Sequence, residues 1–130
     1  MTACMKMPGG GTFEVGPGQV TDDSEMAMCL MWALVEANEG KAGSFLEREL
    51  NSDLIAKWYA NWIKSVPFDI GNSTINGLRP LEEANTIPKA WMSKQSAAEK
   101  NEHSQSNGSL MRCTPMAVWT SSLYQDSNYV

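Results

Sequence analysis

Thr21, Asp22 and Asp23 stand next to one another, and their side chains offer only oxygen atoms. Carboxylate and hydroxyl oxygens suit hard divalent cations such as Mg²⁺ or Mn²⁺, whereas zinc prefers nitrogen or sulfur. Thr and Asp are also common at helix starts, where the helix dipole favours negative charge. Three side chains cannot fill an octahedral shell. The triplet alone therefore leaves two uses open, helix capping and a share in a metal site.

A second candidate is the polar segment Ser106-Asn107-Gly108-Ser109-Leu110-Met111-Arg112. A glycine-containing turn that opens a helix presents free backbone N–H groups, which bind anions. Arg112, one turn further on, could add a bidentate contact to a phosphate. The alternative is an ordinary Asn-Gly turn with Ser109 as the helix cap and Arg112 in solvent.

A third candidate is the loop Asp69-Ile70-Gly71-Asn72. Gly71 would allow a ligand to approach the backbone closely, and Asp69 could accept a hydrogen bond from a sugar hydroxyl. The alternative is a simple turn, since Asp and Asn side chains often bond to their own backbone.

A helix over residues 22–38 is predicted to carry the acidic triplet at its start. Asp22-x-x-Glu25 fits a capping box, and Gly40 supplies a stop. Apolar residues recur at helical spacing at Met26, Leu30, Leu34 and Ala37. The apolar face is broad, which indicates a central helix.

A second helix is predicted over residues 53–65, capped by Ser52 or Asp53 and ended by Pro67. Its stripe of tryptophan and tyrosine side chains could stack on nucleic-acid bases. Core packing is the better interpretation, because only Lys57 and Lys64 supply positive charge nearby.

The remaining segments are punctuated by proline and glycine. Residues 1–20 are predicted as loop with a short extended piece at 12–15, and a short helix is expected at 74–78. A further helix fits 81–84 or 89–98, limited by Pro80 and Pro88. Residues 93–106 are expected to form an exposed loop, and a last helix is expected after Gly108, with Pro115 in its first turn. The expectation is one all-α domain over residues 1–130, helical from residue 21.

Charge and composition exclude several classes of protein. The net charge is −5, which disfavours binding to nucleic-acid phosphates. No apolar run is long enough for a membrane span, and the first residues lack a signal-peptide core. The three cysteines form no Cys-x-x-Cys pair, so we expect reduced thiols in a cytoplasmic protein. A Ser-His-Asp triad could use only His103, which lies in a polar stretch.

Taken together and in order, the three candidates resemble the motifs of the ADP-ribosylglycohydrolases. Residues 16–27, which read G-P-G-Q-V-T-D-D-S-E-M-A, are similar to that family's G-Q-x-T-D-D-[TS]-E-M signature. Residues 67–74, P-F-D-I-G-N-S-T, resemble its P-x-D-x-G-x-x-T loop. Residues 106–112 with Pro115 resemble its S-x-G-N-G-[AS]-[AL]-M-R-x-x-P segment, although Asn107 follows Ser106 directly, without the glycine of the family pattern.

The resemblance implies an all-α orthogonal helical bundle that hydrolyses the N-glycosidic bond between ADP-ribose and a protein side chain, often arginine. It implies a centre of two Mg²⁺ or two Mn²⁺ ions, with ADP-ribose or an ADP-ribosylated protein as partner. By position, the metal ligands would be Thr21, Asp22 and Asp23, with Asp22 and Asp23 as catalytic carboxylates. The ribose side would be lined by Asp69 and Gly71, and the phosphate loop would be formed by Ser106, Asn107, Gly108, Met111 and Arg112.

Two further family motifs have no counterpart in this sequence. One is an earlier helix with a G-D-x-x-G pattern and a metal-binding Glu, and the other is a later aspartate-x-aspartate motif. The expectation is a domain truncated at both ends, with an incomplete metal site and weak or no turnover. Two alternatives stay open: a non-catalytic ADP-ribose binder or crystallin-like relative, and a helical interaction domain. The latter would expose Met-rich and aromatic faces and self-associate or bind a complementing chain.

Overall fold

The computed structural model describes residues 6–41 and 48–127, with side chains up to residue 121. These ranges contain five helices and no strand, which confirms the all-α expectation. The helices are α1 (Asp22–Ala37), α2 (Ser52–Lys64), α3 (Asn72–Glu82), α4 (Ala90–Lys100) and α5 (Thr114–Ser127). None of the helices in the described ranges is long and apolar enough to cross a membrane.

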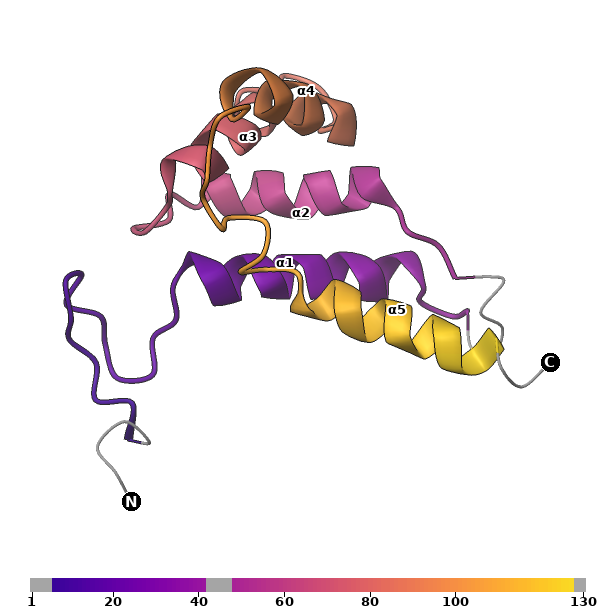
Figure 1. Ribbon diagram of the computed structural model, residues 1–130, viewed down its shortest axis with the longest axis horizontal. Coiled ribbons are helices and arrows are strands. Elements are labelled where there is room, and N and C mark those ends of the chain that lie inside the picture. The colour runs from indigo at the N-terminus through magenta and orange to yellow at the C-terminus, as the bar shows by residue number, and fades with distance from the viewer. Residues whose placement is uncertain (1–5, 42–47, 128–130) are drawn as a thin grey trace.

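Helix α2 lies in the middle of the molecule, with α1 on one side and α3 and α4 on the other, while α5 packs on the far side of α1 (Figure 1). The predicted apolar stripes of α1 and α2 face each other and form the core. The aromatic residues of α2 are therefore used for packing, as the sequence indicated. The buried cluster consists of Met26, Leu30, Leu34, Ala56, Tyr59, Ala60, Trp62, Ile63, Leu78 and Leu81.

Helix α1 begins at the predicted residue but without the predicted capping box. Thr21 is the N-cap; its side chain makes no capping bond, and its carbonyl accepts from the amides of Ser24 and Glu25. Glu25 instead accepts a hydrogen bond of 2.7 Å from Nε1 of Trp62. A buried indole N–H requires a hydrogen-bond partner. The Glu25 side chain, which the sequence pattern assigned to the helix cap, therefore bonds to Trp62 on another helix.

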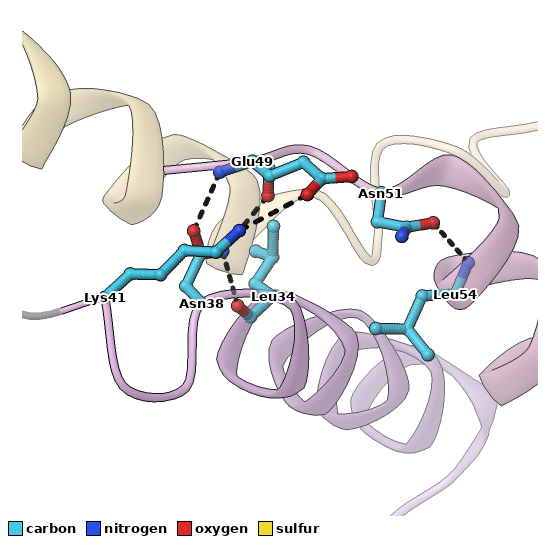
Figure 2. A network of polar contacts seen from close by, with 6 residues as sticks. All are labelled: Leu34, Asn38, Lys41, Glu49, Asn51 and Leu54. Atoms are coloured by element: carbon cyan, nitrogen blue, oxygen red, sulfur yellow. Dashed lines mark hydrogen bonds and ion pairs between the residues drawn. The ribbon is translucent and has the colours of Figure 1, made fainter. Parts of the chain in front are cut away.

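The connection from α1 to α2 is tied by the side chain of Asn38, as Figure 2 shows. Its Nδ2 donates to the carbonyls of Leu34 and Glu49 at 2.8 and 3.1 Å, and its Oδ1 accepts from the Glu49 amide at 2.8 Å. Lys41 pairs with the Glu49 carboxylate at 3.3 Å. Helix α2 is then capped by Asn51, whose Oδ1 accepts from the Leu54 amide at 3.0 Å; the prediction of Ser52 or Asp53 as cap was wrong by one residue.

Helix α3 is longer than predicted because it continues through Pro80. Proline has no N–H, so the carbonyl four residues earlier, on Asn76, loses its helical partner. The hydroxyl of Ser96, on α4, donates to that carbonyl at 2.6 Å. A neighbouring helix thus supplies the missing donor, which a local interpretation of the sequence could not foresee.

Helix α4 confirms the alternative of a helix over residues 89–98, whereas the exposed loop predicted over residues 93–106 was wrong for residues 93–100. The helix starts without a cap from its own N-cap residue, Lys89. Asp53, on α2, accepts instead from the Ala90 amide at 2.9 Å and from Nζ of Lys89 at 2.8 Å. Gly77 of α3 faces Ala97 of α4, and a Cβ at Gly77 would lie at an ordinary contact distance of 3.7 Å from that of Ala97.

Helix α5 starts at Thr114 and not directly after Gly108. The intervening residues form turns, in which the amides of Leu110 and Met111 both donate to the carbonyl of Asn107. Pro115 lies in the first turn of the helix, as expected. At the other end of the chain, the segment predicted to be extended is a turn closed by a bridge between Gly10 and Val15.

Candidate active site

A cavity of about 270 Å³ opens between the start of α1, the loop that precedes α3 and the segment 106–111. The acidic residues at the start of α1 reach this cavity, and α3 starts here directly after Gly71. All three sequence motifs contribute to the lining, although up to 89 residues separate them in the chain. Eight of the predicted site residues line this cavity: Asp22, Asp23, Asp69, Gly71, Ser106, Asn107, Gly108 and Met111.

Negative charge is crowded around Asp22 in the acidic half of the cavity. Burial raises the pKa of Asp22, and the nearby carboxylates of Asp69 and Asp23 raise it further. Only 8% of Asp22 is exposed, while Asp23 is open to solvent. Like charges held together at a helix start create a site that a cation would stabilise.

The donors of the acidic half fit Mg²⁺ or Mn²⁺, because the aspartates and the neighbouring Thr74 and Ser73 offer oxygen only. Thr21 stands at the N-cap beside them and does not line the cavity. Within residues 6–41 and 48–127, no group of three or more His, Cys, Asp or Glu side chains is arranged to hold a metal by itself. A bound cation would therefore need hydroxyls, waters or ligand oxygens in its shell.

The wall opposite the acidic residues is the loop around Gly108. A Cβ at this glycine would lie 3.2 Å from Oγ1 of Thr74, which is itself only 5% exposed. The loop is also held through Ser104, whose Oγ accepts from the Ser106 amide at 3.3 Å and lies 2.8 Å from Oγ of Ser73. The small residue at 108 thus lets the loop lie directly against the start of α3.

A second cavity, of about 210 Å³, lies on the other side of the same loop and shares four lining residues with the first: Ser73, Thr74, Ser106 and Gly108. It is rich in hydroxyl groups, and Arg112 contributes its only charged side chain. Arg112 thus shares the second cavity with Ser106 and Gly108, whereas Asn107 and Met111 line only the first. Further lining comes from Leu78, Ser93, Ala97, Asn101, Ser104, Ser109 and Gly77.

Arg112 is half-buried, which contradicts the alternative of a solvated arginine. Its guanidinium lies over the Tyr59 ring, 5.0 Å from the centroid, and Nη1 lies 3.2 Å from Sδ of Met26. The segment does not open a helix at Gly108, so the anion-binding helix start expected there is replaced by a turn.

Sequence reasoning assigned no site role to several polar residues that line these cavities, among them Ser73, Thr74, Asn101 and Ser104. Ser73 and Thr74 follow Gly71 at the start of α3 and could have been found from that position. Asn101 and Ser104 stand in a stretch with no local pattern. Nδ2 of Asn101 donates to the carbonyl of Ser73 at 2.8 Å, a contact that only the packing of α4 on α3 creates.

This arrangement, with an all-α scaffold, an acidic cavity wall and a polar loop opposite, agrees with a comparison against known families. The chain matches the ADP-ribosylglycohydrolase family over residues 2–128 and belongs to it. By its name, this family is one of hydrolases that cleave glycosidic bonds of ADP-ribosyl groups.

Individual relatives refine the comparison. The chain is 32% identical over 115 residues to the ADP-ribosyl-[dinitrogen reductase] glycohydrolase of Rhodospirillum rubrum, covering 88% of this chain and 33% of the relative. It is 30% identical over 118 residues to the ADP-ribosylarginine hydrolase Tri1 of Pseudomonas putida, covering 87% of this chain and 28% of that protein. The chain thus spans a third or less of the length of these curated relatives. No solved structure matches it significantly.

Proposed function

We propose that this protein is a metal-dependent hydrolase that removes ADP-ribose from a protein side chain, with arginine as the first candidate. The single observation that carries the proposal is the cavity in which Asp22, Asp69 and Gly108, one residue from each motif, lie on shared walls. The arginine linkage is supported by the name of the Pseudomonas relative. The protein would act in the cytoplasm, where the free thiols of Cys29 and Cys113 would stay reduced.

The acidic half would hold the metal. Thr21, Asp22 and Asp23 are the proposed ligands of Mg²⁺ or Mn²⁺, and Asp22 and Asp23 are the proposed catalytic carboxylates. A bound divalent cation would orient ribose hydroxyls and water and offset the charge that develops as the glycosidic bond breaks. Asp69 would accept a hydrogen bond from a ribose hydroxyl, and Gly71 has no side chain to keep the sugar away.

The polar loop would bind the phosphates. Ser106, Asn107 and Gly108 line the first cavity, with Met111 behind them, and Arg112 lines the second. A diphosphate placed against this loop could use hydroxyl donors from one side and the guanidinium from the other. The reaction would break the bond between C1′ of the ribose and the guanidinium nitrogen. Water would supply the hydroxyl to C1′ and the proton to the nitrogen, which leaves free ADP-ribose and an unmodified arginine.

A non-catalytic ADP-ribose binder is the alternative. One observation favours keeping it: the hydroxyl-lined cavity beside Arg112 contains no carboxylate among its lining residues. Phosphate binding there would not require the metal. The same protein could still bind ADP-ribose in the presence of a chelator.

Self-association, or pairing with a complementing chain, forms part of the same proposal. An apolar groove of about 650 Å³ lies between α1 and α5, bordered by exposed side chains of Met31, Val35 and Val118. Sedimentation velocity over a range of concentrations would measure association directly. A monomer at every concentration would remove self-association from the proposal.

The deciding experiment follows ADP-ribose released from an ADP-ribosyl-arginine peptide in Mg²⁺ or Mn²⁺, with and without chelator, alongside calorimetric titration with ADP-ribose. Asp22→Asn tests the metal site, and Glu82→Gln, an exposed carboxylate on α3, is the matched control. Metal-dependent release that Asp22→Asn abolishes and Glu82→Gln preserves would support the hydrolase. Chelator-insensitive binding without release would favour the non-catalytic alternative. A folded protein that neither releases nor binds ADP-ribose would exclude both.

A further inference from the structure

Arg112 is a half-buried cation that the described part of the chain does not neutralise. Three ion pairs are described, Lys41–Glu49, Lys57–Glu36 and Lys89–Asp53, and none of them involves Arg112. No carboxylate lines the cavity that its side chain borders. A guanidinium removed from water without a counter-ion loses solvation, so a structure that keeps one there must stabilise it in another way.

Two uncharged groups stabilise this cation. The ring of Tyr59, on α2, offers its electron-rich face to the guanidinium at 5.0 Å, which is cation–π distance. Tyr59 is 9% exposed and therefore fixed by the core. The thioether of Met26, on α1, accepts weakly from Nη1 at 3.2 Å, and Met26 is fully buried.

The choice of neutral partners has a consequence for binding. A carboxylate in either position would compensate the charge of Arg112 and would have to be displaced by an anionic ligand. A ring face and a sulfur atom fix the direction of the guanidinium but leave its charge available. Arg112 borders a cavity whose other lining residues include six that carry a hydroxyl group: Ser73, Thr74, Ser93, Ser104, Ser106 and Ser109.

We propose that Tyr59 and Met26 are positioning residues that hold Arg112 as an uncompensated cation, so that a phosphate oxygen of ADP-ribose supplies its counter-charge. This inference rests on the proposed function, since it takes ADP-ribose as the ligand. It adds two core residues, from α2 and α1, to the set that determines affinity for the ligand. Neither residue touches the ligand; each acts through Arg112.

The test is calorimetric titration of the full chain with ADP-ribose at fixed Mg²⁺, comparing variants that keep or remove the aromatic face. Tyr59→Phe keeps the ring and is expected to bind within about twofold of the unaltered protein. Tyr59→Leu removes the ring and is expected to weaken binding by roughly three- to tenfold. Met26→Leu removes the sulfur at nearly constant volume and is expected to weaken binding by about twofold to threefold.

A double-variant cycle separates positioning from simple destabilisation. If Tyr59 acts through Arg112, Tyr59→Leu should have no further effect on the dissociation constant once Arg112→Leu is present. Loss of folded protein alone would lower the binding stoichiometry and leave the dissociation constant of the remaining fraction unchanged. The affinity of the unaltered protein should also fall with added salt, and that dependence should be weaker in Arg112→Leu.

The possible results divide cleanly. Equal affinity of Tyr59→Leu and Tyr59→Phe, or additive effects of Tyr59→Leu and Arg112→Leu, would overturn the positioning role while leaving the proposed function intact. Failure of the folded, unaltered protein to bind ADP-ribose would overturn both. Should Tyr59→Leu not fold, Met26→Leu, also measured in the Arg112→Leu background, provides the same cycle from the other contact.

Discussion

Replacing Gly108 with alanine should separate ligand binding from stability, because Gly108 lies where two walls of the candidate site touch. The new Cβ would stand 3.2 Å from Oγ1 of Thr74 and 3.7 Å from Oγ of Ser106. The first distance is a few tenths of an ångström shorter than an ordinary contact. Thr74 is buried at the start of α3 and cannot turn away freely, so we expect the loop to shift and both cavities to change shape.

The size of the effect on stability follows from two opposing contributions. Crowding a packed site by one methyl group costs typically about 1–3 kcal/mol, and exchanging glycine for alanine stabilises by about 0.4–1 kcal/mol through the unfolded chain. The net destabilisation should be about 1 kcal/mol, or a fall in Tm of roughly 3–5 °C for a chain of this size. The affinity for ADP-ribose should be affected more strongly than the stability, because the shift moves the loop away from α3. We expect the affinity to fall at least tenfold.

Gly77→Ala is the matched control for stability alone, because Gly77 borders the second cavity. Its Cβ would meet that of Ala97 at 3.7 Å, an ordinary contact, inside helix α3. Alanine there should raise stability by roughly 0.5–1 kcal/mol. Urea unfolding of both variants and ADP-ribose titration of Gly108→Ala provide the test. Unchanged stability together with unchanged affinity in Gly108→Ala would refute the reasoning that the contact with Thr74 sets the shape of the site.

Three further changes test how the scaffold is held. Ser96→Ala should lower the free energy of unfolding by about 1–3 kcal/mol in urea titration, because the carbonyl of Asn76 loses its substitute donor. Asn38→Ala removes three hydrogen bonds and should cost about 1–3 kcal/mol in the same assay, whereas Glu39→Ala should be nearly neutral. Bonds from Lys89 and the Ala90 amide hold the pKa of Asp53 below its ordinary 3.8. That stabilisation is therefore complete above pH 3.8 and is lost as the pH falls through the lower folded value, so the stability advantage over Asp53→Asn should shrink below pH 4.

Each of these scaffold predictions has a result that would contradict it. Ser96→Ala with unaltered stability would mean that the Asn76 carbonyl finds water or another donor. Equal losses of unfolding free energy in Asn38→Ala and Glu39→Ala would mean that the effect comes from the exposed turn and not from the hydrogen bonds of Figure 2. A stability difference between the native protein and Asp53→Asn that stays constant from pH 6 to pH 3 would show that the charge of Asp53 does not matter.

The sequence predicts some elements well and others poorly, for identifiable physical reasons. Helices α1 and α2 were placed to within a residue or two because a single buried face repeats along each of them, as at Met26, Leu30 and Leu34. Helix α3 was predicted too short, and α4 was predicted only as one of two alternatives, because the ends of these helices are satisfied by each other or by α2. A proline such as Pro80 need not stop a helix when another donor replaces its missing amide. Here the donor is Ser96, which lies sixteen residues further along the chain, so the local sequence around Pro80 does not reveal it.

The candidate site shows the same division. Asp22, Asp69 and Gly108 were identified from their residue types and order, and the structure brings them to one cavity. The direction of the Arg112 side chain could not be predicted, because it depends on Tyr59 and Met26, which read as ordinary core residues. Asn101 and Ser104 likewise could not be predicted as lining residues, because they reach the cavity only through the packing of α4 against α3.

Helix α4 depends on other helices at both of its ends. Asp53 of α2 caps its first turn, and Asn101, at its C-cap, donates to the carbonyl of Ser73 on α3. An isolated peptide of residues 89–101 lacks these partners, and a helix of eleven residues is marginal in water on its own. We therefore expect α4 to become helical only after α2 and α3 are in place. Its amides should therefore gain protection from hydrogen exchange later than those of α1 and α2, so the cavity bordered by Asn101 and Ser104 closes in one of the last steps of folding.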